Sequence, residues 1–398
     1  MNRIEKNKVG NPRLLVFLLT LLVILPMLAT DVYLPALPFL QESLSTNQAN
    51  VMLTLTAYMI GYSSSLMISG VISDRYGRRP IILAGIAIFA AASVASIFIE
   101  SIGGLVLLRF IQAFGGGSAT LLARVVVRDL FDCNDQVRIL SYLSAGLALS
   151  PTAGPILGGM LVESVGWRGT FVFIAAFSLI LFTLAFLLLR ESHTHCKNKL
   201  SLLDTLIELR LLGTHREFIA YTLIISLAWS IYFSFIASSS FLLQQYFDLG
   251  PVAYGFSFSA VIIGYIAGTV FTRKRGAHTS LDSLIRRASI LVLLASSLML
   301  LFSALEVINL FFLLLLVAVI LFGVGAIFPA TQVAVMRPFK SNFGLVAGSF
   351  YAIEMFFGAI TGGILGLFKS ISPLIASCMM AIAALLMYVT IRIMLPHK

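Results

Sequence analysis

The chain alternates long apolar stretches with short polar loops, and this alternation limits what it can fold into. A helix needs about 20 mostly apolar residues to cross the hydrocarbon core of a bilayer. Charged residues make up 11% of the 398 residues, against about 25% in a typical soluble domain. We therefore predict an all-α membrane protein with twelve transmembrane helices. The expected spans lie near residues 14–36, 50–72, 80–99, 104–127, 138–162, 168–189, 217–243, 252–272, 286–305, 309–331, 343–367 and 372–393.

The positions of the basic residues predict the orientation of these spans. Of the 27 Lys and Arg residues, 24 fall in the two termini and in alternate loops. The opposite loops hold only Arg168 and Lys369, and Arg109 lies within a span. Because cytoplasmic loops carry the excess of basic residues, we expect both termini in the cytoplasm. This explains the net charge of +10 better than nucleic-acid binding does, because no basic stripe is present.

One polar connection, residues 190–216, is much longer than the others and divides the chain into two halves, 1–189 and 217–398. A weak internal repeat supports this division. The pattern Gly70-x-x-x-Asp74-Arg75 returns 198 residues later as Gly268-x-x-x-Thr272-Arg273, where the acid is lost. Likewise, Gly154-Pro155-x-x-Gly158-Gly159 has a counterpart in Gly358-x-x-x-Gly362-Gly363. Two parallel repeats of six helices around a central cavity are typical of one class of secondary transporters.

Few ionisable side chains lie within the expected spans, and three of them stand out: Asp31, Arg109 and Glu354. Such residues are costly there, by roughly 2.5–3.5 kcal/mol on insertion scales, and mark functional sites by default. Asp31 and Arg109 fall at the same depth near the outer ends of the first and fourth spans, so they can pair if both face the cavity, and such a site can take up and release a proton. The alternatives are that Asp31 only caps its helix and that Arg109 extends to the interface. Glu354 is a second proton site, a contact for a cationic substrate, or a neutral hydrogen-bonded acid.

The short loop between the second and third spans carries an unusual cluster of charges, with Asp74 among Arg75, Arg78 and Arg79. Together with Gly70 and Gly77, this loop resembles the corresponding loop of the major facilitator superfamily. Three further segments resemble the twelve-span drug:proton antiporters of that superfamily, most closely the Bcr/CflA branch. These segments are Asp31-x-Tyr33-Leu-Pro35-Ala-Leu-Pro38, Leu105-x-x-x-Arg109-x-x-Gln112 and Gly146…Gly154-Pro155-x-x-Gly158-Gly159.

The resemblance implies two six-helix bundles related by a pseudo-two-fold axis, with Arg109 taking part in proton coupling. The fifth-span motif of Gly146, Gly154, Pro155, Gly158 and Gly159 is typical of antiporters, and its small residues permit close helix crossing.

The resemblance also implies a cytoplasmic gate. In it, Arg78 pairs with Asp129 at the inner end of the fourth span, and Asp74 meets the beginning of the eleventh span near Gly344 and Gly348. The gate residues are Gly70, Asp74, Arg75, Gly77, Arg78 and Asp129.

The chain departs from the family pattern at two places. Ser150 stands where a further glycine is common, and Tyr351 and Glu354 follow Ala347-Gly348 where small uncharged residues are usual.

Aromatic residues on the spans predict a mildly polar cavity for amphipathic or aromatic compounds and, through the ring faces, for cations. The alternative is that these rings face lipid or fill the helix packing. The expected cavity residues are Tyr33, Tyr58, Gln112, Trp229, Tyr232, Phe233 and Tyr265.

These observations predict a monomeric proton-coupled antiporter that exports small organic molecules, drugs or amphipathic metabolites, across the bacterial inner membrane by alternating access. Its partners are then the substrate, protons and the lipid bilayer. The alternatives are a dedicated exporter of an endogenous metabolite such as a siderophore, a proton-coupled importer, or a transport-dead membrane sensor. We expect no enzyme, cofactor or metal site, since the sequence lacks a nucleotide-binding loop and His193-x-His195 lacks partner carboxylates.

Overall fold

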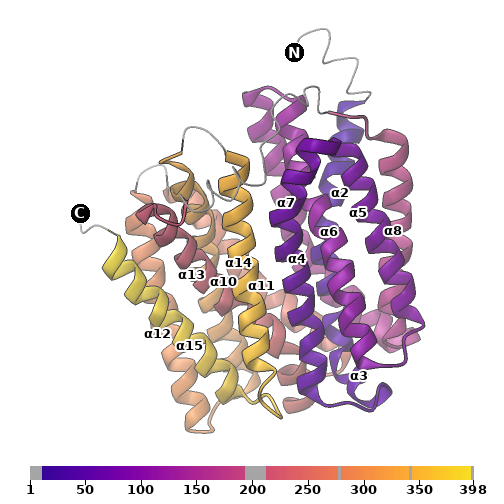
Figure 1. Ribbon diagram of the computed structural model, residues 1–398. Coiled ribbons are helices and arrows are strands. Elements are labelled where there is room, and N and C mark those ends of the chain that lie inside the picture. Colours follow the sequence, from indigo (N-terminus) through magenta and orange to yellow (C-terminus); the bar gives the residue numbers. More distant parts are fainter. Residues whose placement is uncertain (1–10, 193–211, 277–278, 340–342, 396–398) are drawn as a thin grey trace.

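A computed structural model describes residues 11–192, 212–276, 279–339 and 343–395. Within these ranges the chain is helical throughout, without strands (Figure 1). Twelve helical segments are long and apolar enough to cross a membrane, which confirms the predicted number. The first half holds α2 (Pro12–Asp31), η1 (Leu34–Ala36), α3 (Leu37–Ser43), α4 (Gln48–Tyr76), α5 (Arg78–Ile97), α6 (Ile102–Leu130), α7 (Cys133–Val165) and α8 (Arg168–Leu188). The second half holds α10 (Arg216–Phe241), η2 (Leu242–Tyr246), α11 (Pro251–Arg275), α12 (Leu281–Ala304), α13 (Leu310–Met336), α14 (Phe343–Leu365) and α15 (Pro373–Met394).

Most helices extend beyond the apolar stretches that predict them, because a helix does not end where the hydrocarbon does. The first span shows the largest difference, since it was expected to end at residue 36 and reaches Ser43. Most of the predicted linker, 190–216, lies outside the described residues. We refer to α2–α8 as the N-terminal half and to α10–α15 as the C-terminal half.

The two halves repeat one packing scheme. In the N-terminal half α2 contacts α6 and α7, while α5 lies between α6 and α8. In the C-terminal half α10 contacts α13 and α14, while α12 lies between α13 and α15. Across the halves α4 packs on α14, and its counterpart α11 packs on α7. The weak sequence repeat therefore corresponds to an approximate two-fold arrangement of helices.

The described chain begins and ends at one end of the molecule (Figure 1), which we call the Arg78 face. The other end, which we call the Gln244 face, carries several hydrogen bonds between the halves. Ser240 Oγ donates to the carbonyl of Leu34 at 2.6 Å, and Gln244 Nε2 donates to the carbonyl of Pro35 at 3.2 Å. Gln245 and Gln41 pair at 2.8 Å nearby. In this conformation the halves are therefore joined at the Gln244 face.

The first span is broken shortly before it reaches the Gln244 face. Helix α2 ends at Asp31, and a short 3-10 turn, η1, follows before α3 begins. Pro35 and Pro38 explain the break, because neither supplies the backbone N–H that a continuous α-helix needs. The carbonyls of Leu34 and Pro35 at this break accept the hydrogen bonds from the C-terminal half. The break also leaves Asp31 at the C-terminal end of a helix, beside the meeting surface of the two halves.

Candidate functional site

Asp31 is buried, with 6% of its surface exposed. Its Oδ2 accepts a hydrogen bond from Ser150 Oγ on α7 at 2.5 Å. Ser150 is the residue that departs from the glycine expected in the fifth-span motif, so the departure places a donor on the carboxylate. The predicted direct contact of Asp31 with Arg109 is wrong for this conformation, since no ion pair joins them within the described ranges. The reason lies in the surroundings of the guanidinium.

Arg109 is fully buried on α6, between two aromatic rings. Its guanidinium carbon lies 4.3 Å from the ring centre of Tyr33 and 4.1 Å from that of Tyr58. Nη1 donates to Gln112 Oε1 at 2.6 Å and to the carbonyl of Ala29 at 3.4 Å. The ring faces and these two acceptors hold the cation at the depth of Ala29, so the predicted common depth with Asp31 agrees with the structure. Arg109 does not extend to the interface.

Each residue around Arg109 is fixed by a partner of its own. Tyr33 shares a hydrogen bond of 2.9 Å with Thr54, and Tyr58 donates to the carbonyl of Pro26 at 2.7 Å. Gln112 Nε2 donates to Ser93 Oγ at 2.7 Å. The predicted cavity residues Tyr33, Tyr58 and Gln112 are thus all buried in one network around a fixed positive charge.

The glycines of the fifth-span motif lie where helices touch. A Cβ on Gly154 would meet the Cβ of Asp31 at 2.5 Å, and one on Gly158 would collide with the carbonyl of Val32. A Cβ on Gly159 would collide with the carbonyl of Pro251 at the start of α11. A Cβ on Gly146 would collide with the side-chain methyl group of Thr20 on α2. The motif, with Pro155 within it, therefore packs α7 against both α2 and the C-terminal half.

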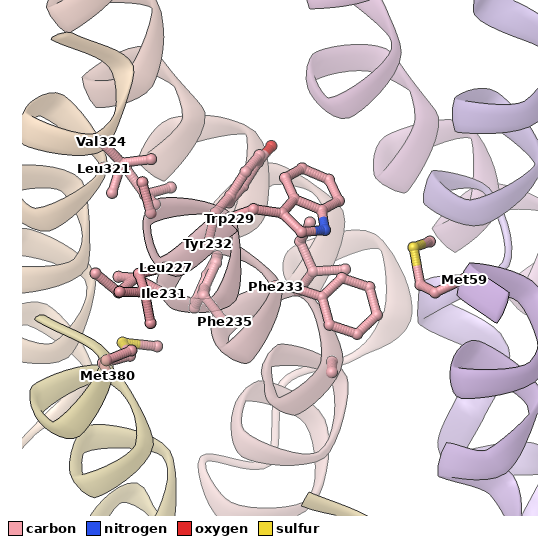
Figure 2. Close-up of a cluster of buried hydrophobic side chains, with 14 of the residues drawn as sticks. Met59, Leu227, Trp229, Ile231, Tyr232, Phe233, Phe235, Leu321, Val324 and Met380 are labelled. Carbon is pink, nitrogen blue, oxygen red and sulfur yellow. The ribbon is translucent and has the colours of Figure 1, made fainter. Parts of the chain in front are cut away.

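The predicted aromatic residues of the C-terminal half form one cluster. Trp229 packs edge-on against Tyr232 with ring centres 5.5 Å apart, and Tyr232 stacks on Tyr265 at 5.4 Å. Figure 2 shows Trp229 and Phe233 pointing from α10 in the direction of Met59 in the N-terminal half. Trp229, Tyr232 and Phe233 are buried within the protein, so they do not face lipid.

Glu354 lies on α14 with 2% of its surface exposed. Its Oε2 makes no hydrogen bond with any described residue. Tyr351, one helical turn before it on α14, packs against the guanidinium of Arg124 from α6, which lies 5.1 Å from the ring centre.

The charged loop at the Arg78 face contains the predicted ion pair. Arg78 Nε lies 3.2 Å from Asp129 Oδ2, and Arg78 Nη1 lies 2.5 Å from Asp74 Oδ1. Gly77 adopts a φ of 95°, which only glycine tolerates without strain, so the sharp turn is as expected. Gly70 makes only ordinary van der Waals contact, and Arg75 packs on its neighbour Tyr76 outside the cluster.

The residues around Gly344, at the beginning of the eleventh span, lie outside the part of the structure whose side chains are described, so the predicted contact of Asp74 with this region stays a prediction. In the described part, the Asp74 carboxylate pairs with Arg78 in its own half, and 42% of the Asp74 side chain is exposed. A Cβ on Gly348 would lie 3.6 Å from the carbonyl of Leu66, which is more than two helical turns before Asp74 on α4.

Sequence reasoning missed one acid at this face, Glu191. Its two carboxylate oxygens accept the backbone N–H groups of Arg78 and Arg79 at 2.9 and 3.1 Å, at the start of α5. Arg79 in turn donates to the carbonyls of Leu189 and Phe186 at the end of α8. The negative Glu191 thus lies at the N-terminal end of α5 and the positive Arg79 at the C-terminal end of α8, which is the favourable sign at each helix end. In the sequence, the signal for this role of Glu191 is an acidic residue directly after the sixth expected span.

Among the described residues, no group of three or more His, Cys, Asp or Glu side chains has a metal-binding arrangement. The site consists instead of two buried acids, one buried arginine and aromatic rings between two helical halves. A multi-pass helical membrane protein with such a centre is built to bind and move a solute.

Comparisons with known proteins agree with this geometry. The chain is 28% identical to multidrug resistance protein D of Escherichia coli (strain K12) over 88% of this chain and 85% of that protein. It is also 28% identical to a bicyclomycin resistance protein homolog of Haemophilus influenzae (strain ATCC 51907 / DSM 11121 / KW20 / Rd), over 67% of this chain and 69% of that protein. Against another curated relative the match spans 65% of that protein's length, just under two thirds.

A crystal structure of a D-xylose-proton symporter superposes with a TM-score of 0.76 over 97% of this chain and 98% of that one. At 15% identity this likeness concerns the fold alone. The family model described as Major Facilitator Superfamily matches residues 19–363. The approximate two-fold packing, the twelve spans and this match lead to one conclusion: the chain belongs to the Major Facilitator Superfamily, a family of membrane transporters and not of enzymes.

Proposed function

We propose that this transporter is a proton-coupled antiporter that exports small organic molecules across a bacterial inner membrane, as a monomer with its termini in the cytoplasm. The observation that carries the proposal is Asp31, a buried carboxylate at the broken end of α2 whose hydrogen-bond partner is the neutral hydroxyl of Ser150. The resistance proteins among its relatives support a drug-like cargo.

Asp31 and Arg109 have different parts in this mechanism. A guanidinium stays protonated in proteins, so Arg109 is a constant positive charge. Asp31 is the group whose charge changes when a proton binds or leaves. Because Arg109 is held by rings and carbonyls instead of by Asp31, the carboxylate is left free for a proton or for a cargo molecule. Competition between the two at Asp31 couples export to proton entry.

Alternating access follows from the two halves. With the termini cytoplasmic, the Gln244 face is the outer one, and the bonds of Ser240 and Gln244 to the first span close it. The cluster of Arg78, Asp74 and Asp129 lies at the cytoplasmic face of the N-terminal half, and the exposed Asp74 is the member that engages the C-terminal half when this face closes. Rocking of the halves then breaks the outer contacts while the contact of Asp74 across the cytoplasmic face forms.

The test is substrate-induced proton release from purified protein in weakly buffered detergent, with a panel of lipophilic drugs and metal-chelating metabolites. We expect release from the wild type and none from Asp31→Asn. Asp135→Asn, an exposed acid at the start of α7, is the matched control and should release protons normally. Substrate binding without proton release in the wild type contradicts antiport, and the panel itself separates drug export from export of a dedicated metabolite.

A further inference from the structure

We infer that Glu354 and the aromatic residues around it bind the positive group of a lipophilic organic cation. This inference rests on the proposed function, since it assumes that cargo binds between the two halves, and it assigns the cargo a chemical class. The site lies on the C-terminal half, opposite Asp31 and Arg109, and is formed by α10, α11 and α14.

The first observation is an unsatisfied acceptor. Glu354 is 2% exposed, its Oε2 has no hydrogen-bond partner among the described residues, and no ion pair to it is present there. A buried carboxylate oxygen without a partner is costly, so it marks a place where a further group belongs. Arg124 forms no ion pair with Glu354 among the described residues, and its guanidinium lies over the ring of Tyr351, 5.1 Å from the ring centre.

The second observation is the aromatic wall beside this acid. Gly358 lies one helical turn after Glu354, and a Cβ there would come within 2.5 Å of Trp229 Nε1. The glycine thus lets the indole lie directly against α14, next to the turn that carries Glu354. Trp229 Nε1 is itself buried without a partner among the described residues. Phe328 closes the cluster, with its ring centre 6.3 Å from Trp229 and 5.8 Å from Tyr265.

The chemistry of these residues selects the ligand. One carboxylate surrounded by rings cannot supply the six or more oxygen ligands that a hard metal ion prefers. Ring faces and a single negative charge suit a cation with a large apolar surface, which binds through cation–π contacts and one ion pair. Arg124, on α6 in the other half, packs on Tyr351 and leaves the carboxylate of Glu354 available for the ligand's charge.

The stacked tyrosines continue the aromatic wall. Tyr232 packs edge-on against Trp229, and Tyr265 stacks on Tyr232 with an angle of 18° between the ring planes. A cation with aromatic substituents can therefore lie along these rings with its charge at Glu354. The proton site and the cation site are then distinct, one on each half.

The experiment measures equilibrium binding of tetraphenylphosphonium to the purified full-length protein, and of triphenylphosphine oxide as an uncharged compound with similar rings. We expect Glu354→Gln to weaken tetraphenylphosphonium binding by about tenfold or more and to change binding of the oxide by less than about twofold. Glu163→Gln, an exposed acid near the end of α7, is the matched control and should bind both compounds as the wild type does.

A second pair of variants tests the aromatic residues beside Glu354 while Glu354 itself is unchanged. Tyr265→Phe keeps the ring and should keep cation binding within about twofold, whereas Tyr265→Leu should weaken it by about fivefold or more, with a smaller loss for the oxide. If Glu354→Gln fails to fold, these two Tyr265 variants still test whether the site binds the cation. Equal losses for both compounds, unchanged cation binding in Glu354→Gln or in Tyr265→Leu, or no saturable cation binding to the wild type overturn the inference.

Proton release measured on the same samples separates the two proposals. If cation binding depends on Glu354 but no proton is released from the wild type, the cation site stands and proton antiport fails. If protons are released in an Asp31-dependent way but Glu354→Gln binds the cation normally, antiport stands and the cation site fails.

Discussion

At the scale of single residues, the defining feature is a fully buried arginine held by aromatic rings instead of by an acid. The planes of Tyr33 and Tyr58 lie on the guanidinium at 4.3 and 4.1 Å, and Gln112 fixes its edge. A planar, delocalised cation fits this slot, whereas an ammonium ion does not fill it and keeps a stronger hydration shell. The site thus requires an arginine and not simply a positive charge.

We therefore expect Arg109→Lys to lower transport driven by a proton gradient by about a hundredfold, almost as much as Arg109→Ala. The measurement is initial uptake of a panel compound into inverted membrane vesicles. Arg168→Lys is the control, because Arg168 also packs on an aromatic ring, 4.2 Å from that of Trp167, but is exposed. Near-normal transport by Arg109→Lys would mean that charge alone suffices.

The sequence identified the charges at this scale but not their partners. Asp31, Arg109 and Glu354 stand out because ionisable residues are rare in spans. Whether Asp31 faces Arg109 or Ser150 depends on the rotation of α2 about its axis, which the apolar pattern of a helix buried on most sides does not reveal. Ser150 was noticeable as a departure from the family pattern, and its role became clear only from its distance to the carboxylate.

At the scale of elements, the close crossing of α7 over the end of α2 positions the site. Gly158 lies against the carbonyl of Val32, immediately after Asp31, so this contact sets the position of the carboxylate. The number and order of the spans were predictable from apolar length alone. The break in the first span was not predicted, although Pro35 and Pro38 account for it, and the extension to Ser43 was not predictable from hydropathy, since polar residues continue the helix.

We expect Gly158→Ala to destabilise the protein by roughly 1–3 kcal/mol, because the added methyl group meets a backbone carbonyl that cannot move aside. Thermal unfolding in detergent, followed by circular dichroism, gives the comparison. Gly103→Ala on α6 is the matched control, since a Cβ there has no neighbour within 4 Å, and it should unfold at the wild-type temperature or above. Equal melting temperatures for the two variants would show that the crossing tolerates a side chain.

At the scale of the whole molecule, two halves with the same packing scheme carry different chemistry. Trp229 follows Asp31 by 198 residues, the offset of the sequence repeat, so corresponding positions carry an acid in one half and an indole in the other. The close contacts of α7 with α11, and those of η1 with α10, join the halves toward the Gln244 face. Opening that face requires these contacts to separate.

We expect a cross-link between Gln41→Cys and Gln245→Cys to reduce transport by about tenfold or more, because the outer face can then no longer open. The pair is made in a variant without the three native cysteines and joined with a bifunctional methanethiosulfonate reagent. Each single variant treated with the reagent is the control, and a reducing agent should restore transport. Full transport by the cross-linked protein would contradict opening at this face.

The burial of α10 has a consequence for the order of synthesis. This helix carries six buried serines, Ser226, Ser230, Ser234, Ser238, Ser239 and Ser240, and is surrounded by protein along nearly its whole length. Three of the helices that pack on it, α13, α14 and α15, come later in the chain. While the ribosome is still making them, the part of α10 that packs on these three helices has lipid or the insertion machinery beside it. The C-terminal half therefore cannot complete its fold until the last helix has been made, and a nascent chain that stops earlier leaves this serine-rich helix partly exposed to the bilayer.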